Sequence, residues 1–460
     1  MKKVYIAHNT CLNSSYDLNV LQSGLDQNGF EIVSMPEQAD EIIYSGCSVR
    51  GRWVDDAVLQ IDEARRRAPD AKISVTGCLA NTSANEVLSK TSSTDITFSP
   101  MSEILKNYTG LQFSEVDQQL SQNSHASFES HGSDGLRNLR QRVGAAKASI
   151  VADLQEADRN HNTQTERVYR QTTKGFVFYN EQDPCEMITV TRSCLYKCSF
   201  CSIPQGRGEF ESVPLADIVG KARKAIALGK HHLVLIGDEI GNYLAPGSRT
   251  RFPDLVAALL DLHPEVTLSI RYIEPKPFLK YSKNILQWSK AGKIRLLYIS
   301  LQSGSMRILK AMNRGYDIAR LTKSLKEFRQ CSPTVLYGNW LIGFPGEERS
   351  DFLETVSLVQ DLDFHINVAI PFSARENTPA FTMDNQLDER VIEERVRELT
   401  DVIANMKASA MQSELRLLDA DSRDRLVERI RQAECEQYVD DQQTSEPRRV
   451  ATSLIEVKQL

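Results

Sequence analysis

The first hundred residues alternate between short apolar runs and amphipathic stretches. Leucines at helical spacing predict a helix over 17–28, which Gly29 ends, and a charged amphipathic stretch predicts a second over 54–67. The apolar runs predict buried strands at residues 3–7, 41–44, 72–76 and 95–98. This alternation is typical of a small α/β unit.

From residue 186 the alternation resumes with greater regularity. Apolar runs predict strands at 187–191, 232–236, 266–270, 296–301, 335–342 and 365–370. Amphipathic stretches predict helices at 215–228, 252–262, 305–312, 318–330 and 348–362. We therefore predict an α/β fold with a parallel barrel or partial barrel, whose functional groups gather at the C-terminal ends of its strands.

Two further segments lack this alternation. Residues 116–165 are rich in Gln, Asn, Ser and His, with one amphipathic helical pattern over 136–154, and residues 388–435 read as helix. The 136–154 helix is expected to bridge domains, and a substrate or partner clamp is the alternative. We predict four segments: an N-terminal domain at 1–115, a linker at 116–170, the barrel at 171–385 and a helical extension at 386–460.

Composition excludes several classes of protein. The 460 residues include 55 basic and 61 acidic side chains and carry a net charge of −6, which is not typical of a generic nucleic-acid binder. Nine cysteines are too few for a disulfide scaffold of this length. No apolar run is long enough to span a bilayer, and the N-terminus enters a strand without a signal peptide. We expect a cytoplasmic protein with no membrane partner.

The main chemical feature is a CxxxCxxC loop formed by Cys194, Cys198 and Cys201 directly after the first predicted barrel strand. Three thiolates can hold three irons of a cubane cluster and leave the fourth iron open. Structural zinc sites and ferredoxin-type clusters normally take four protein ligands. The spacing therefore favours a cluster that binds an additional ligand, and a zinc knuckle is the alternative.

A second set of cysteines lies in the N-terminal region. Cys11, Cys47 and Cys78 each follow a predicted strand, and loops after parallel strands converge on one sheet edge. We expect the three to meet as metal ligands; the alternative is that each is a small buried hydrophobe.

Other polar and small residues follow the barrel strands. Small residues allow close approach of a ligand, while carboxylates and an amide can hydrogen-bond an ammonium group and ribose hydroxyls. We call the C-terminal ends of the barrel strands the mouth. The candidate cofactor contacts at the mouth are Gly237, Asp238, Glu239, Gln302, Ile342 and Gly343.

Together these features resemble the radical SAM methylthiotransferase family, from about residue 3 to about residue 410. Its N-terminal cysteine motif is similar to Cys11–Asp17, and its conserved core is similar to Met312-Asn313-Arg314-Gly315. Further matching stretches are 46–50, 76–80, 203–208, 301–305, 342–347 and 377–380.

The resemblance implies a methylthiotransferase that uses two 4Fe-4S clusters and S-adenosylmethionine. Cys194, Cys198 and Cys201 would hold the cluster that cleaves S-adenosylmethionine into a 5′-deoxyadenosyl radical, with Phe200 as the aromatic residue beside the cofactor. Cys11, Cys47 and Cys78 would hold the cluster that delivers the methylthio group to an unactivated C–H carbon. A reductant such as flavodoxin or ferredoxin and a sulfur donor are implied partners.

The acceptor is less clearly indicated. Residues 240–243 and 273–275 resemble the branch that acts on threonylcarbamoyl-adenosine in tRNA. However, Glu209 and Glu211 stand where tRNA-acting members are basic, and the family's C-terminal TRAM domain has no recognisable counterpart. We therefore expect a peptide, protein or small-molecule acceptor, with tRNA as the alternative. A radical SAM enzyme whose N-terminal cluster only relays electrons and a non-catalytic metal-binding module are further alternatives.

Overall fold

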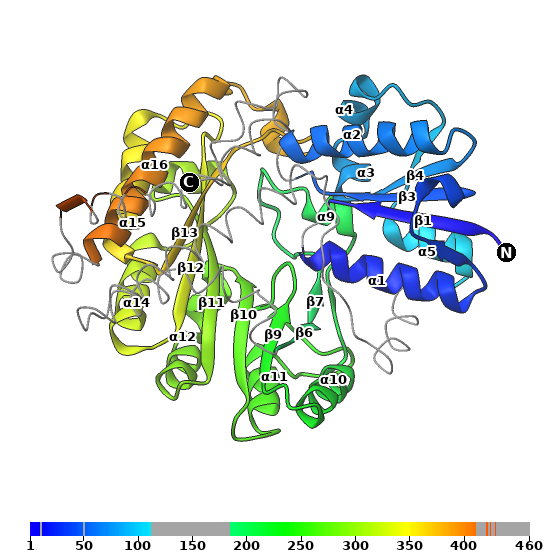
Figure 1. Ribbon diagram of the computed structural model, residues 1–460. Coiled ribbons are helices and arrows are strands. Elements are labelled where there is room, and N and C mark those ends of the chain that lie inside the picture. The colour runs from blue at the N-terminus through cyan, green and yellow to red at the C-terminus, as the bar shows by residue number, and fades with distance from the viewer. Residues whose placement is uncertain are drawn as a thin grey trace.

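The computed structural model describes residues 1–9, 12–48, 51–111 and 185–410, with single positions at 420, 421, 424 and 428. Two α/β units lie side by side (Figure 1): the N-terminal unit, residues 3–111, and the barrel unit, residues 185–410. The predicted linker helix at 136–154 and any TRAM counterpart after residue 428 lie outside the described residues, and the predicted domain boundaries stay predictions.

The N-terminal unit has a five-stranded sheet of order β2-β1-β3-β4-β5, in which all neighbouring strands are parallel. The strands are β1 (Lys3–His8), β2 (Glu31–Val33), β3 (Glu41–Gly46), β4 (Lys72–Gly77) and β5 (Ile96–Phe98). The helices are α1 (Leu12–Gln27), η1 (Pro36–Gln38), α2 (Gly51–Arg67), α3 (Cys78–Thr82), α4 (Ala84–Lys90) and α5 (Met101–Thr109). The four predicted strands are confirmed; β2 has only three residues and no alternating pattern to reveal it.

The barrel unit has six parallel strands in sequential order, β13-β12-β11-β10-β9-β6. They are β6 (Cys185–Thr189), β9 (His232–Ile236), β10 (Thr267–Ile273), β11 (Ile294–Gln302), β12 (Val335–Ile342) and β13 (Ile366–Pro371). Because β6 and β13 each have a single neighbour in this sheet, the barrel is partial, as predicted.

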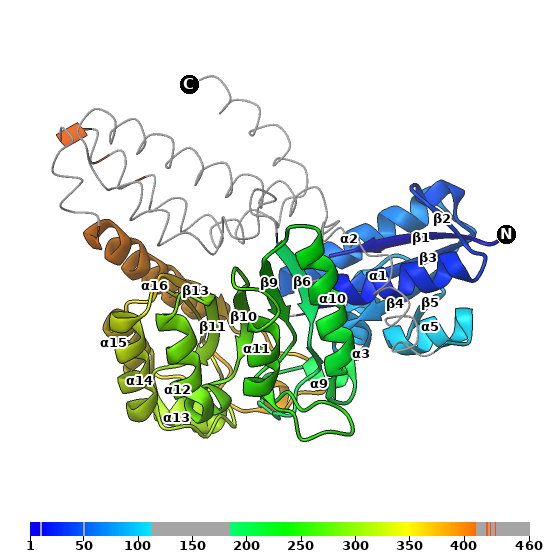
Figure 2. The same cartoon turned by 90° about the horizontal axis from the view of Figure 1, so that it is seen from below.

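Helices follow the barrel strands and cover their outer side (Figure 2). They are α10 (Leu215–Ala227), α11 (Phe252–Leu260), α12 (Pro275–Lys290), α13 (Met306–Ala311), α14 (Ile318–Cys331), α15 (Arg349–Leu362) and α16 (Glu389–Ala410). Short elements complete the unit: β7 (Thr191–Arg192), α9 (Ile203–Arg207), β8 (Glu211–Ser212) and η2 (Pro379–Thr382). The five predicted helices are confirmed, while α12 was not predicted.

Alternation along the strands separates two faces of the barrel sheet. Leu297, Ile299 and Leu301 of β11 belong to the large hydrophobic core between sheet and helices. The intervening residues Leu296 and Tyr298 belong to a separate buried cluster on the other, concave face. The concave face therefore has its own lining.

A shared hydrophobic cluster joins the two units. Val234 and Ile236 of β9 cluster with Leu18 and Leu21 of α1. The N-terminal unit thus packs on the first strands of the barrel. Among the described residues, no helix is long and apolar enough to cross a membrane.

Candidate functional site

The CxxxCxxC loop runs from β7 to α9, with Cys198 buried and Cys194 and Cys201 partly buried. The loop after α13 fixes its conformation. Ser199 donates from its N–H to the Met312 carbonyl at 3.0 Å, and Asn313 Nδ2 donates to the Lys197 carbonyl at 2.7 Å. The segment Met312–Gly315 therefore acts as a scaffold for the cysteine loop.

Burial raises the pKa of all three thiols above its ordinary value, to about 12 for Cys201, where the neighbouring Cys198 adds to the effect. The Arg314 guanidinium, 3.6 Å from Cys198 Sγ, opposes the shift of that thiol. Three sulfur atoms in one loop, where burial disfavours bare thiolates, suit a positively charged metal core that would neutralise them. The donor set fits an iron–sulfur cluster with three protein ligands.

Two of the three N-terminal cysteines lie in the described residues. Gly46 of β3 pairs with Gly77 of β4, so Cys47 and Cys78 leave the sheet at the same level, and both are buried. The Cys47 N–H donates to Asn9 Oδ1 at 3.0 Å, which ties it to the end of β1. Cys11 lies outside the described residues, two positions beyond Asn9. The prediction that cysteines after parallel strands lie at one edge of the sheet therefore holds for Cys47 and Cys78, the two that the structure describes.

The two units meet close to Cys78. A Cβ added at Gly206 of α9 would lie 2.9 Å from Cys78 Cα and 3.1 Å from Cys78 Sγ, so only glycine fits there. Asn81 Nδ2 donates to the Gln205 carbonyl at 3.0 Å, and Gln205 Nε2 donates to the Asn377 carbonyl at 3.1 Å. We call this contact of α3, α9 and the loop at 373–377 the seam.

The carboxylates predicted as cofactor contacts make internal contacts. Asp238 Oδ2 accepts a 2.8 Å hydrogen bond from the Ser193 N–H and pairs with Arg207. The Glu239 carboxylate accepts from the N–H groups of Gly241 and Asn242, each at 2.8 Å. Both side chains therefore shape the loops at the mouth.

The glycines of the mouth are explained by close packing. A Cβ on Gly237 would lie 2.2 Å from Thr191 Oγ1. Gly343 has a φ of +84°, and a Cβ there would lie 2.4 Å from Ile392 of α16. Ile342 is fully buried in the large core, and Phe200 packs against the same core. These residues determine the shape of the mouth.

Gln302 differs from the other candidates because it has unused hydrogen-bonding capacity. It lies buried at the end of β11 with a φ of +73°, and its Oε1 has no hydrogen-bond partner among the described residues. Asn339 Oδ1 and Thr189 Oγ1 are likewise buried and unpartnered there. Asn339 and Thr189 alternate with residues of the helix-facing core, so they lie on the concave face. Buried polar atoms normally have partners, so this face suits a polar ligand.

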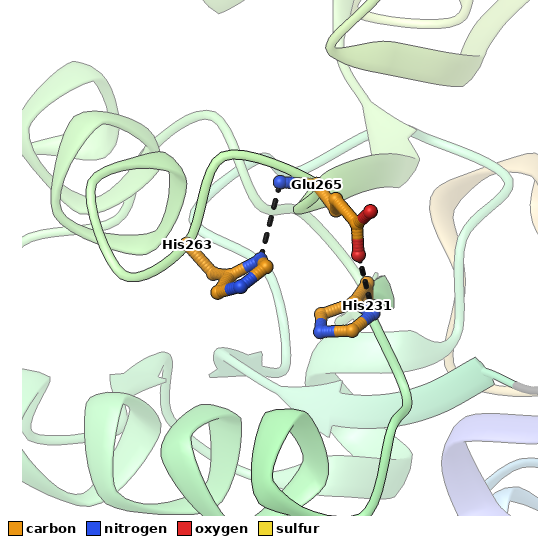
Figure 3. A group of neighbouring side chains, drawn as sticks. All are labelled: His231, His263 and Glu265. Carbon is orange, nitrogen blue, oxygen red and sulfur yellow. Dashed lines mark hydrogen bonds and ion pairs between the residues drawn. The ribbon is translucent and has the colours of Figure 1, made fainter.

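A histidine group at the opposite end of the barrel strands does not have the geometry of a metal site (Figure 3). His231, His263 and Glu265 place one ligand atom each within 4.8 Å of one another. The two imidazole rings, however, are stacked at 4.5 Å with an interplanar angle of 21°. A metal ion must lie near the plane of each ligating ring, which nearly parallel stacked rings do not allow. The next residue, His232, is buried and hydrogen-bonded to Ser269 at 3.0 Å.

The parallel partial barrel with a CxxxCxxC loop at the C-terminal end of its first strand defines a radical SAM enzyme. Comparison with known families agrees: residues 188–359 match the model described as the Radical SAM superfamily, and residues 3–99 match the one described as Uncharacterized protein family UPF0004.

Comparison with known proteins refines the family. A tRNA-2-methylthio-N(6)-dimethylallyladenosine synthase of Nitrosomonas eutropha is 26% identical over 410 residues, covering 87% of this chain and 83% of that protein. A protein of the same name from Photobacterium profundum is 24% identical over 440 residues, covering 92% and 81%. The chain belongs to the radical SAM methylthiotransferase family. It is therefore a transferase that uses S-adenosylmethionine and two 4Fe-4S clusters.

A solved structure shares the fold. The radical S-adenosylmethionine methyltransferase TsrM from Kitasatospora setae, with tryptophan and a SAM analogue bound, aligns with a TM-score of 0.50 and 13% identity. The alignment covers 83% of this chain and 75% of TsrM. At this identity the likeness concerns the fold alone.

Several residues of the site were missed as functional candidates by sequence reasoning. Arg314 and Glu274 lie in stretches that the family resemblance singled out, but their ion pair joins elements forty residues apart. Arg375, from the loop after β13, is buried beside Glu86 of α4 at 3.4 Å. The only signal in the sequence that could have pointed to these residues is that they are charged residues within otherwise small or apolar motifs.

Proposed function

We propose that this enzyme inserts a methylthio group into an N6-modified adenosine of tRNA. In this proposal Cys194, Cys198 and Cys201 hold the cluster that binds S-adenosylmethionine, and Cys11, Cys47 and Cys78 hold the second. When bound, the first cluster would supply the one-electron chemistry that cleaves S-adenosylmethionine, and a reductant such as flavodoxin or ferredoxin would provide the electron. A sulfur donor completes the partners.

The protein's own groups have separate tasks in this scheme. Gln302 Oε1, a buried acceptor without a partner among the described residues, is available to a hydroxyl or ammonium group of S-adenosylmethionine. Phe200 supplies an apolar side chain within the cysteine loop, while Gly237, Ile342 and Gly343 pack inside the protein and shape the loops around the site. Asp238 and Glu239 hold the loops that carry these groups.

The observation that supports tRNA as the acceptor is the extent of the similarity to the tRNA-modifying relatives. The Nitrosomonas eutropha alignment spans 87% of this chain, so it must include most of the described residues of both units. The stretches at 240–243 and 273–275 resemble the branch that acts on threonylcarbamoyl-adenosine. Gly241, Asn242 and Glu274 within them make contacts inside the protein, so these stretches do not decide which N6-modified adenosine is the acceptor.

The concave face also carries a ladder of aromatic side chains. Tyr298 of β11 and Tyr337 of β12 stack at 4.1 Å with an interplanar angle of 5°, and Tyr272 of β10 lies 4.6 Å from Tyr298. Arg271 Cζ lies 5.2 Å from the centre of the Tyr272 ring. Proteins bind splayed RNA bases by stacking on aromatic rings and guanidinium planes, and this ladder contains both kinds of group.

A peptide, protein or small-molecule acceptor is the second candidate. Glu209 and Glu211 are exposed just after α9. Negative charge there opposes the phosphate backbone of a nucleic acid, which proteins neutralise with Lys and Arg.

Nucleoside mass spectrometry separates the two candidates. The gene, or its Cys198→Ala variant as an inactive control, is expressed in a host that lacks its own methylthiotransferases. Gain of a methylthio-adenosine with the active gene only supports the tRNA proposal, and the mass of the N6 group distinguishes dimethylallyl from threonylcarbamoyl. Unchanged tRNA, with S-adenosylmethionine cleavage intact in the purified enzyme, rejects it.

The remaining alternatives are separated by product and metal analysis. An enzyme whose N-terminal cluster only relays electrons would cleave S-adenosylmethionine without adding the mass of a methylthio group. A non-catalytic module would bind iron or zinc without any cleavage.

A further inference from the structure

Arg207 lies at the contact between the two units, next to Gly206 in α9. It is the last residue of α9, and its side chain is 7% exposed. Its Nε lies 2.7 Å from Asp238 Oδ2, and its Nη2 lies 2.9 Å from Asp17 Oδ2. Its Nη1 donates to Ser14 Oγ at 3.1 Å. One guanidinium thus contacts both units.

On the barrel side, this contact reaches the backbone beside the first cysteine of the loop. Asp238 Oδ2 accepts from the Ser193 N–H at 2.8 Å, and Ser193 Oγ donates to the Gly208 carbonyl at 2.6 Å. Ser193 has a φ of +61°, in the left-handed region that non-glycine residues rarely adopt. The hydrogen bonds of Ser193, rather than its intrinsic backbone preference, therefore hold the turn into Cys194. Arg207 therefore helps to fix the position of the cysteine loop.

On the other side, the contact reaches the first turns of α1, directly after Cys11. Ser14 is buried and the Asp17 side chain is 14% exposed. Arg192, two positions before Cys194, places its Nε 3.8 Å from Asp17 Oδ1. Asp17 thus lies between two arginines that flank the cysteine loop in sequence.

Charges of both signs meet at this contact. Arg192 and Arg207 carry two positive charges, and Asp17 and Asp238 carry two negative charges, all with side chains at most 14% exposed. Buried ion pairs are weak evidence for stability, but they define geometry strictly, because a displaced partner leaves a buried charge uncompensated. Buried charges of opposite sign that meet in this way are suited to fix a separation.

We propose that Arg207 and Asp17 are positioning residues that set the separation of the two metal sites through this contact between α9 and α1. This inference rests on the proposed assignment of the two cysteine groups as ligands. Both sites must act on one acceptor carbon, so a change in their separation uncouples S-adenosylmethionine cleavage from methylthio transfer.

The test uses Asp17→Asn in the full-length, cluster-loaded enzyme. This change removes the carboxylate of α1 that pairs with Arg207 and leaves the Arg207–Asp238 pair in place. Glu186→Gln is the matched control, because its 2.7 Å pair with Lys230 lies within the barrel unit. Iron content, 5′-deoxyadenosine, methylthio product and the magnetic interaction between the two reduced clusters are measured for each protein.

We expect Asp17→Asn to keep its iron and its rate of 5′-deoxyadenosine formation. Methylthio product per 5′-deoxyadenosine should fall about tenfold or more, since an ångström-scale misplacement can cost on the order of a hundredfold. The magnetic interaction, which depends steeply on distance, should weaken. Glu186→Gln should match the wild type in all four measurements.

Two results would overturn the inference. The first is an Asp17→Asn enzyme whose product ratio and magnetic interaction equal those of the wild type. The second is loss of iron from the N-terminal site alone, which would make Asp17 a determinant of that site. If Asp17→Asn does not fold, Arg207→Lys provides a second test. Lysine keeps the positive charge but lacks the planar guanidinium that contacts Asp17, Ser14 and Asp238 together. The magnetic measurement needs no acceptor, so a wrong acceptor does not affect the conclusion.

Discussion

The guanidinium of Arg314 lies 3.6 Å from the Sγ atom of Cys198. The same guanidinium pairs with Glu274 Oε2 at 2.5 Å and donates to the Ser300 carbonyl. Arg314 is buried, and its pKa lies far above the ordinary range because the Glu274 carboxylate outweighs the effect of burial. A permanent positive charge therefore lies beside one proposed ligand of the cluster that binds S-adenosylmethionine.

Replacing Arg314 by Met should destabilise the protein by about 3–5 kcal/mol, because the mostly buried Glu274 carboxylate loses its charged partner. It should also shift the midpoint potential of the cluster on Cys198 to lower values, since a nearby positive charge favours the reduced form. Arg329→Met, which breaks a partly exposed pair with Asp363, should cost at most about 1 kcal/mol. Thermal unfolding and redox titration followed by EPR measure the two effects, and equal stability of both variants would contradict the prediction.

Iron content should show whether both cysteine groups bind a cluster. Reconstituted enzyme should hold about eight irons per chain, and replacing Cys11, Cys47 and Cys78 together by Ala should leave about half. A triple variant that kept all its iron would show that the N-terminal cysteines are not ligands.

Single cysteine variants should separate the two half-reactions. Cys198→Ala should abolish 5′-deoxyadenosine formation under dithionite. Cys47→Ala should leave cleavage intact and stop methylthio transfer. Chromatography of the nucleoside products measures both, and methylthio product from Cys47→Ala would rule out the two-cluster scheme.

Gly206→Ala should weaken the seam. The new methyl group would lie 2.9 Å from Cys78 Cα, and overpacking of this kind costs about 1–3 kcal/mol. Gly220→Ala in α10, where the added Cβ meets nothing within 4 Å, is the matched control and should be neutral or stabilising. Thermal unfolding of both loaded variants tests this; equal midpoints would show that α9 moves freely relative to α3.

Glu239 should make stability depend on pH. Its pKa is raised to about 7, first by burial and then by the nearby Glu274 carboxylate. In the unfolded chain the carboxyl titrates near its ordinary value of about 4.3. Between these values the folded protein binds more protons than the unfolded chain, so stability falls as pH rises through this window. Glu239→Gln should flatten this fall in unfolding midpoints measured from about pH 4 to about pH 8. The exposed Glu265→Gln change should leave the slope as in the wild type, and an unchanged slope in Glu239→Gln would contradict the assignment.

The sequence predicted those parts of the site that depend on local pattern. Cys47 and Cys78 could be placed together because each directly follows a strand, and the register of Gly46 with Gly77 confirms that they leave the sheet at one level. The start of α1 was predicted five residues too late, because residues 12–16 carry no regular apolar spacing. Local pattern does not predict a helix whose first turn depends on tertiary contacts.

The electrostatic contacts were not predictable in the same way. Arg207 contacts Asp17, which lies 190 positions earlier, and Arg314 contacts Glu274, forty positions earlier. Nothing in residue spacing distinguishes such a pair from two solvated charges. Asp238 and Glu239 were predicted as cofactor contacts for their residue types, whereas their carboxylates accept backbone N–H groups in the structure.

The cysteine loop has a further consequence for how the protein is made. Its Ser199 carbonyl accepts a 2.8 Å hydrogen bond from the N–H of Ala380, which lies beyond the last barrel strand. A nascent chain that has emerged only as far as β12 carries all nine cysteines but one and still lacks this contact. The loop therefore gains this backbone contact only once the chain beyond β13 has been made, so its final shape depends on a segment synthesised about 180 residues after it.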